Sequence, residues 1–124
     1  MIKICKLDMP NRRGIVINDY LNSLLNGNSY SLRLINSKPF RKCTADIQDY
    51  TLYFDEEKFY ITALTSYNTV RAIVINSKLG GKCWFICAGN YSQTTTQHLH
   101  KFFKDYNIPI NSLLDIEYCT LYEI

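Results

Sequence analysis

The residues best suited to chemistry lie in one short stretch, where four hydroxyl side chains come directly before a histidine. The hydroxyls are those of Ser92, Thr94, Thr95 and Thr96, and the histidine is His98. Thr94 and Thr95 lie four and three residues before His98, so all three share one face of an expected helix. Unpaired N–H groups at a helix N-terminus attract anions. The stretch therefore predicts either an anion site made by Ser92, Thr94, Thr95 and His98, or a helix cap followed by a structural histidine.

Other residues that could catalyse a reaction or hold a metal form no recognisable motif. His98 and His100 are two residues apart, so on a helix they point about 200° away from each other. The sequence contains no His-Glu-x-x-His, no Gly-x-Ser-x-Gly and no glycine-rich phosphate loop. Its five cysteines are an odd number and none forms a Cys-x-x-Cys pair, which favours free thiols. We expect no catalytic residues, no metal and no cofactor.

Positive charge is concentrated near the start of the chain, whose formal net charge is +3. Residues 1–44 carry eight Lys and Arg against two Asp, which gives +6, and the remaining residues give −3. The basic residues that could form a patch are Arg12, Arg13, Lys38, Arg41 and Lys42. Such a patch could face phosphates or a protein partner, or it could simply be a solvated surface.

The elements that must position these residues follow from the hydrophobic pattern. Two helices are expected, over residues 18–26 and 94–106, because apolar residues recur there at helical spacing. Alternating or β-rich segments predict strands over 2–7, 30–35, 40–47, 50–54, 59–65, 69–76, 82–88 and 114–122. The breaks between most of the middle strands are short, which favours antiparallel hairpins. We therefore expect one α+β domain, residues 1–124, with two helices packed on a twisted, mainly antiparallel sheet.

The ten tyrosines suggest a binding surface. Tyr50, Tyr53 and Tyr60 fall in the expected middle strands, where successive side chains face opposite sides of a sheet. If helices cover one side, tyrosines such as Tyr53 stay exposed on the other. Exposed tyrosine is common in protein interfaces and also stacks on nucleobases. The alternative is that each tyrosine is an ordinary core or cross-strand residue.

No apolar run approaches the roughly 20 residues of a membrane helix. The N-terminal residues alternate apolar and polar side chains and lack the continuous apolar segment of a signal peptide. We expect a cytoplasmic protein without a membrane partner.

Two segments carry a resemblance to a known group of proteins. Residues 66–72 read Ser-Tyr-Asn-Thr-Val-Arg-Ala, and residues 91–98 read Tyr-Ser-Gln-Thr-Thr-Thr-Gln-His with Phe102 one turn later. This resembles small phage-encoded proteins that share an approximate S-Y-x-T-x-x-A … Y-S-x-T-T-x-x-H-x-x-x-F pattern. The resemblance covers roughly residues 60–104 and transfers no catalytic residue. A physical interpretation of the shared residues is that Thr69 and His98 form a hydrogen bond that fixes the second helix to the sheet.

The resemblance implies a phage or mobile-element origin, and small phage accessory proteins often act against host defence. The leading expectation is a protein that binds and inhibits a bacterial defence protein or ribonucleoprotein, such as a CRISPR effector. Its tentative binding residues are Arg12, Arg13, Lys38, Arg41, Lys42 and Tyr53. The alternatives are a nucleic-acid-binding accessory protein that uses the basic residues, and an enzyme acting at Thr94–His98. The sequence does not indicate an oligomeric state.

Overall fold

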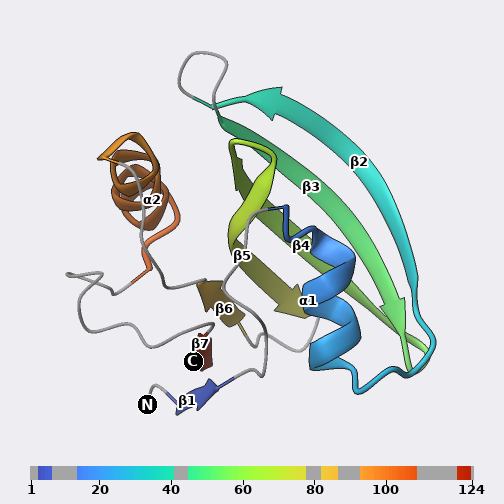
Figure 1. Cartoon of the computed structure of the whole chain (residues 1–124). Helices are drawn as coiled ribbons and strands as arrows, with labels where there is room; N and C mark the ends of the chain where they lie inside the picture. The colour runs from blue at the N-terminus through green and yellow to red at the C-terminus, as the bar shows by residue number, and fades with distance from the viewer. Residues whose placement is uncertain are drawn as a thin grey trace.

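The computed structural model describes residues 3–6, 14–40, 45–77, 82–86, 93–108 and 120–123. These residues form an α+β fold in which the described strands join one antiparallel sheet (Figure 1). The elements are β1 (Lys3–Lys6), α1 (Ile17–Leu24), β2 (Ser31–Pro39), β3 (Ala45–Phe54), β4 (Glu57–Ser66), β5 (Thr69–Ser77), β6 (Lys82–Ile86), α2 (Gln93–Asp105) and β7 (Thr120–Glu123). The predicted fold class is confirmed.

The order of the described strands across the sheet is β1-β7-β6-β5-β4-β3-β2. Strands β2 to β6 pair with their neighbours in sequence, as the short connections predict. β7 pairs with β6 and with β1, so the first and last described strands lie side by side at the edge opposite β2. The long strands β2, β3 and β4 form a curved, extended ribbon, as Figure 1 shows.

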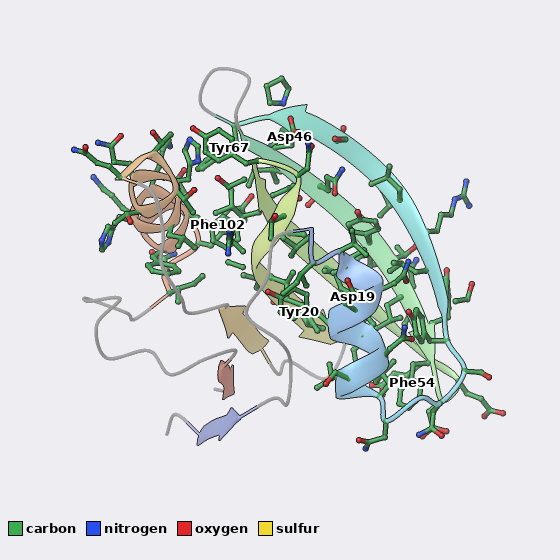
Figure 2. The ribbon with its side chains drawn as sticks, in the orientation of Figure 1. Asp19, Tyr20, Asp46, Phe54, Tyr67 and Phe102 are labelled. Carbon is green, nitrogen blue, oxygen red and sulfur yellow. The ribbon has the colours of Figure 1, made fainter. Side chains whose placement is uncertain are left out.

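The two helices pack on opposite faces of this sheet, because residues that alternate along the strands contact different helices. Ile61 and Ala63 of β4 lie in one buried cluster with Tyr20 and Leu21 of α1. Leu64, the next residue of β4, lies in a second cluster, whose helical members are Leu99, Phe102 and Phe103 of α2. In Figure 2, Tyr20 lies on α1 and Phe102 on α2 where each helix approaches the sheet. The period-2 pattern of the strands thus supplies both cores.

Both helices end in the same way, with an asparagine in the left-handed region. Asn26 follows α1 with φ +52° and Asn107 follows α2 with φ +54°. The next residue donates back into the helix in each case: Gly27 N bonds Asn22 O at 3.0 Å and Ile108 N bonds Phe103 O at 2.8 Å. These bonds satisfy carbonyls that the helix end leaves unpaired.

α1 begins at Ile17, one residue before the predicted range 18–26. Val16 is the N-cap residue, and its backbone N donates to Asp19 Oδ2 at 2.8 Å. The hydroxyl of Tyr20 then donates to the carbonyl of Val70 at 3.0 Å in the interior. The helix is therefore held to β5 by a buried hydrogen bond as well as by apolar contact.

Two of the predicted strand breaks are wrong. A break was expected over residues 36–39, but β2 continues through these residues and Pro39 pairs with Asp46. Proline is tolerated at the end of an edge strand, because its missing N–H costs no ladder bond there. The predicted strands over 40–47 and 50–54 are one continuous strand, β3, over Ala45–Phe54, and residues 41–44 lie outside the described residues. Residues 114–119 of the predicted last strand lie outside the described residues.

Two tight hairpin turns carry positive φ angles without glycine. Asp55 and Glu56 join β3 to β4 with φ of +51° and +61°, and Tyr67 and Asn68 join β4 to β5 with φ of +50° and +61°. Two-residue turns with both residues in this region fit the twist of a hairpin and favour asparagine or glycine. Tyr67, exposed at the tip of its hairpin (Figure 2), therefore holds a costly conformation.

We expect Tyr67→Asn to raise the free energy of unfolding by about 0.5–1 kcal/mol, because asparagine tolerates this conformation better than tyrosine. Urea unfolding of the variant beside the native protein measures the change. An unchanged or lower unfolding free energy would show that the Tyr67 ring contributes more to stability than its conformation costs.

Candidate functional site

The polar residues singled out by their chemistry meet inside the protein, between α2 and the end of β4. Ser66 Oγ lies 3.1 Å from Thr95 Oγ1 and 3.1 Å from His98 Nδ1. The three side chains are 0%, 3% and 2% exposed. We name this group the Ser66–Thr95–His98 cluster. Its position means that a helix and a strand share a hydrogen-bonded junction within the hydrophobic core.

The surrounding elements explain why these side chains converge. Ser66 is the last residue of β4 before the Tyr67–Asn68 turn, and its side chain lies on the same face of β4 as Leu64. Thr95 and His98 are three residues apart on α2, so they share the helix face that packs on the sheet. The rings of Phe40 and His98 lie 6.4 Å apart between centroids. Apolar packing therefore encloses the cluster.

The hydrogen-bond partner predicted for His98 is wrong, because the partner lies on the other side of the β4–β5 turn. The sequence suggested Thr69, but the hydroxyl of Thr69 accepts a hydrogen bond from Gly14 N at 2.9 Å. Ser66, on the opposite side of the two-residue turn, bonds His98 instead. The expected junction between α2 and the sheet is nevertheless present, with a different hydroxyl.

The chemistry open to this cluster is limited by its burial. A nucleophilic serine must meet a substrate, and Ser66 has no exposed surface. Leaving a buried polar group without its partner costs roughly 1–3 kcal/mol, so these hydrogen bonds contribute to stability. The arrangement is suited to fixing α2 on the sheet.

The residues of the predicted anion site are separated by this packing. Thr95 and His98 point into the protein, and Thr94 is half-buried. Ser92 lies outside the described residues. The structure thus brings Thr95 and His98 together, but around Ser66 rather than around a site open to solvent.

The predicted partner-binding residues are only partly described. Lys38 is exposed on β2, and Tyr53 is exposed on β3. Arg12, Arg13, Arg41 and Lys42 lie outside the described residues, so their grouping stays a prediction.

Tyr53 belongs to a surface group that the sequence did not reveal. The register of the β3–β4 hairpin places Tyr53 opposite Lys58 and Thr51 opposite Tyr60, while β2 places Arg33 opposite Thr51. All of these side chains lie on the α2 side of the sheet, because they alternate with core residues on the α1 side. We name the exposed Arg33, Tyr53 and Tyr60, together with the half-buried Lys58, the tyrosine face. Recognition of the two-residue turn at Asp55–Glu56 would have fixed this register from sequence.

Lys58 lies between the two tyrosine rings. Its Nζ is 5.8 Å from the ring centroid of Tyr53 and 5.2 Å from that of Tyr60. A hydrogen bond with the Tyr60 side chain, followed by the charges of both tyrosines, raises the pKa of Lys58. The Lys58 ammonium group therefore lies against both aromatic rings.

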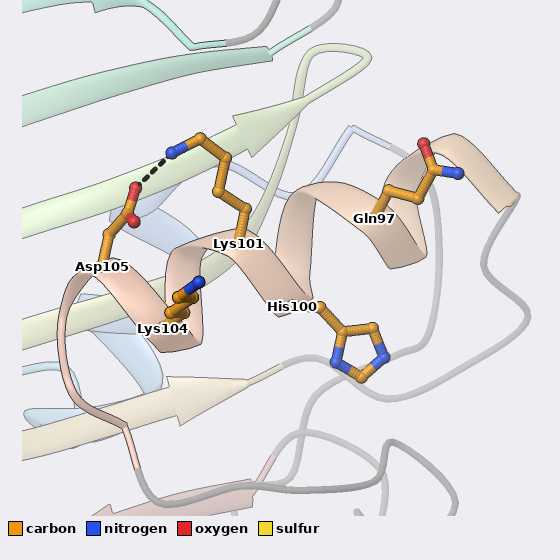
Figure 3. Close-up of a pocket in the computed structure, with 5 residues that line it drawn as sticks. All are labelled: Gln97, His100, Lys101, Lys104 and Asp105. Atoms are coloured by element: carbon orange, nitrogen blue, oxygen red, sulfur yellow. Dashed lines mark hydrogen bonds and ion pairs between the residues drawn. The ribbon is translucent and has the colours of Figure 1, made fainter.

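A shallow hollow of about 440 Å³ lies along α2 (Figure 3). Its described lining residues are Gln97, His100, Lys101, Lys104 and Asp105. Lys101 Nζ pairs with Asp105 Oδ2 at 2.6 Å and lies 5.2 Å from the centroid of the Phe40 ring. All five of these lining residues belong to α2.

The described residues contain neither a candidate metal site nor a candidate membrane-spanning helix. No group of three or more His, Cys, Asp or Glu side chains among them could hold a metal ion. No helix within the described ranges is long and apolar enough to cross a membrane.

Comparison with known proteins identifies a family for this chain. Residues 6–117 match the sequence model of a family of unknown function, DUF8033. No curated protein and no solved structure matches the chain.

Proposed function

We propose that this chain, which belongs to the DUF8033 family, acts by binding another protein and not by catalysis. In this proposal it is a phage or mobile-element accessory protein that inhibits a bacterial defence system, such as a CRISPR effector, in the cytoplasm of the host. The biological part rests on the resemblance of residues 66–72 and 91–102 to phage-encoded proteins. The physical part rests on where the structure puts its polar and apolar side chains.

The burial of the Ser66–Thr95–His98 cluster supports binding over catalysis. This cluster contains the histidine and hydroxyls that a nucleophilic mechanism would need, and its members are almost fully buried. Their hydrogen bonds join two elements of the fold. Residues available to a partner must therefore lie elsewhere, on the outer surface.

The observation that carries the proposal is the edge strand β2. It is nine residues long, and in the part of the chain that the structure describes it pairs only with β3. Leu34 and Ile35, at the bulge in this strand, are 51% and 58% exposed. An exposed sheet edge can pair with an extended segment of another protein through main-chain hydrogen bonds.

Features at both ends of β2 restrict which partner can pair. Arg33 and Lys38 are exposed and positive, and Pro39 ends the strand. Charged residues, bulges and proline are the devices that keep edge strands from pairing indiscriminately. The edge therefore suits a partner segment with apolar residues beside Leu34 and Ile35 and acidic residues beside Arg33 and Lys38.

We expect the double variant Leu34→Glu/Ile35→Glu to lose its partner while staying folded. Both side chains are exposed, so the fold loses little, whereas a paired strand would bury two carboxylates. The tagged protein is used to capture partners from a nuclease-treated lysate of the bacterial host. We predict one stoichiometric partner, a component of a defence system, recovered at least about tenfold less with the double variant, which corresponds to about 1.4 kcal/mol.

Val16→Glu is the matched control for this experiment. Val16 is 47% exposed at the start of α1, outside β2, so its substitution should leave recovery unchanged. Equal recovery with the double variant would contradict the edge as the binding surface. A partner captured from an untreated lysate but not from the nuclease-treated lysate would contradict binding to a protein. That result would favour nucleic acid bound through the basic residues.

A further inference from the structure

The tyrosine face combines exposed aromatic rings with cations on an uncovered part of the sheet. Tyr53 and Tyr60 are 49% and 44% exposed, and Arg33 is exposed beside them. We propose that this face binds single-stranded nucleic acid by stacking bases on Tyr53 and Tyr60. This activity goes beyond the proposed protein binding, and its test needs no protein partner.

The register places the two rings where neighbouring bases could stack. Tyr53 faces Lys58 across the β3–β4 pair, and Tyr60 is two residues further along β4 on the same face. Such diagonal neighbours lie roughly 7–8 Å apart between their backbones, within reach of large side chains. Thr51 pairs with Arg33 on one side and with Tyr60 on the other, and it is only 7% exposed. The two tyrosine rings therefore project further from the sheet than Thr51 does. Exposed aromatic side chains on a sheet are a common platform for unpaired bases.

The cations alternate with the rings. Rows across the sheet run Ser31, Tyr53, Lys58 and then Arg33, Thr51, Tyr60. Lys58 already contacts both rings, so a phosphate that reaches Lys58 has its base beside a tyrosine. Arg33 extends the positive surface toward the β2 edge, and Lys38 lies further along the same face of β2. This interleaving of charge and ring matches the alternation of phosphate and base in a single strand.

Acidic residues near this face set the direction of a bound strand. Asp55 and Glu56 form the hairpin turn, and the register of Glu57 opposite Phe54 puts its side chain on the α1 side. Asp49 lies on the tyrosine face, where it accepts a hydrogen bond from Thr62 at 2.9 Å. A polyanion is therefore repelled from the hairpin tip. It would run across the strands, from Tyr60 and Tyr53 toward Arg33.

The expected ligand is unpaired and of mixed sequence. Stacking uses the flat surface of a base, which all bases have and which a duplex hides. No base-edge recognition follows from two tyrosines, one lysine and one arginine. DNA and RNA strands share the chemistry that the face can recognise, so both are used as probes.

The test is fluorescence anisotropy of the purified protein with fluorescein-labelled dT12 and rU12 and with a 12-base-pair DNA duplex. We expect the protein to bind at least one single-stranded probe more tightly than the duplex. Tyr53→Ser/Tyr60→Ser should weaken that binding at least about tenfold, since each stacked base contributes measurably. Tyr53→Phe/Tyr60→Phe keeps the rings and should bind within about twofold of the native protein. The stronger of the two probes, dT12 or rU12, identifies the nucleic acid preferred.

Two controls separate stacking from other effects. Tyr67→Ser removes an exposed tyrosine at the other hairpin tip and should leave binding unchanged. Lys58→Gln should weaken binding and reduce the slope of affinity against salt by about one. Circular dichroism tests whether the Tyr53→Ser/Tyr60→Ser variant is folded. If the serine variant is unfolded, a competition experiment with the native protein replaces it. Inorganic polyphosphate is added to the complex with dT12 or rU12, and a stacking site must prefer the oligonucleotide to the polyphosphate.

Three results would overturn the proposal. The first is no binding of either single-stranded probe at low salt. The second is equal affinity of the native protein and the folded serine variant, which would mean that charge alone attracts the probe. The third is displacement of the oligonucleotide by polyphosphate at the same phosphate concentration. None of these outcomes depends on the β2 edge, so the protein-binding proposal stands or fails separately.

Discussion

Phe102→Ala should lower the free energy of unfolding by about 3–5 kcal/mol, the range for removing a buried phenylalanine from a packed core. Phe102 is fully buried and joins the cluster that holds α2 against β3, β4 and β5. Its ring also lies 4.6 Å from that of Tyr106, one turn further along the helix. The substitution removes both contacts and leaves a cavity. Urea unfolding followed by circular dichroism measures the loss.

Phe102→Leu is the matched control, because leucine keeps most of the apolar volume and should cost far less than alanine. The same loss for leucine and alanine would show that the ring contact with Tyr106, and not burial, carries the effect. A loss below about 1 kcal/mol for alanine would contradict the tight packing of α2 on the sheet.

His98→Ala should cost about 1–3 kcal/mol, because it leaves the buried hydroxyl of Ser66 without its imidazole partner. The side chain is 2% exposed and its Nδ1 lies 3.1 Å from Ser66 Oγ. His100→Ala, two residues along the same helix but exposed, should change stability by less than about 0.5 kcal/mol. Thermal melts of both variants, with partner capture at a temperature where each is folded, separate stability from function. A His98→Ala protein that melts like the native protein but captures no partner would make His98 a binding residue.

The helices could be predicted closely because their signals are local. The predicted ranges 18–26 and 94–106 differ by one or two residues from Ile17–Leu24 and Gln93–Asp105. Apolar spacing defines the buried face, and the same asparagine-ended motif closes both helices. The hairpins were predictable for the same reason, since two short polar breaks coincide with the two tight turns.

The partner of His98 could not be predicted, because it depends on which side of a turn faces the helix. Ser66 and Thr69 pair with each other at the ends of β4 and β5, and both are buried. A register shift follows immediately, between Leu64 and Thr65. Periodicity along one strand cannot locate such a shift. The sequence therefore indicated a hydroxyl–histidine junction without identifying its hydroxyl.

The path of β2 was mispredicted for a different reason. Asn36, Lys38 and Pro39 are poor strand formers, and together they indicate a break. In the structure they belong to an edge strand, where proline and charge are tolerated. Edge or centre is a property of the assembled sheet, so local preference alone could not settle it. The same assembly creates the tyrosine face, whose members come from three strands.

The Ser66–Thr95–His98 cluster joins α2 to the sheet, and we therefore place function on the outer surface. A double-mutant cycle of Ser66→Ala and His98→Ala, measured by urea unfolding, tests this junction. We predict a coupling energy of at least about 0.5–1 kcal/mol, so that the double variant loses less stability than the two single losses added together. Fully additive losses, or single variants as stable as the native protein, would contradict the claim.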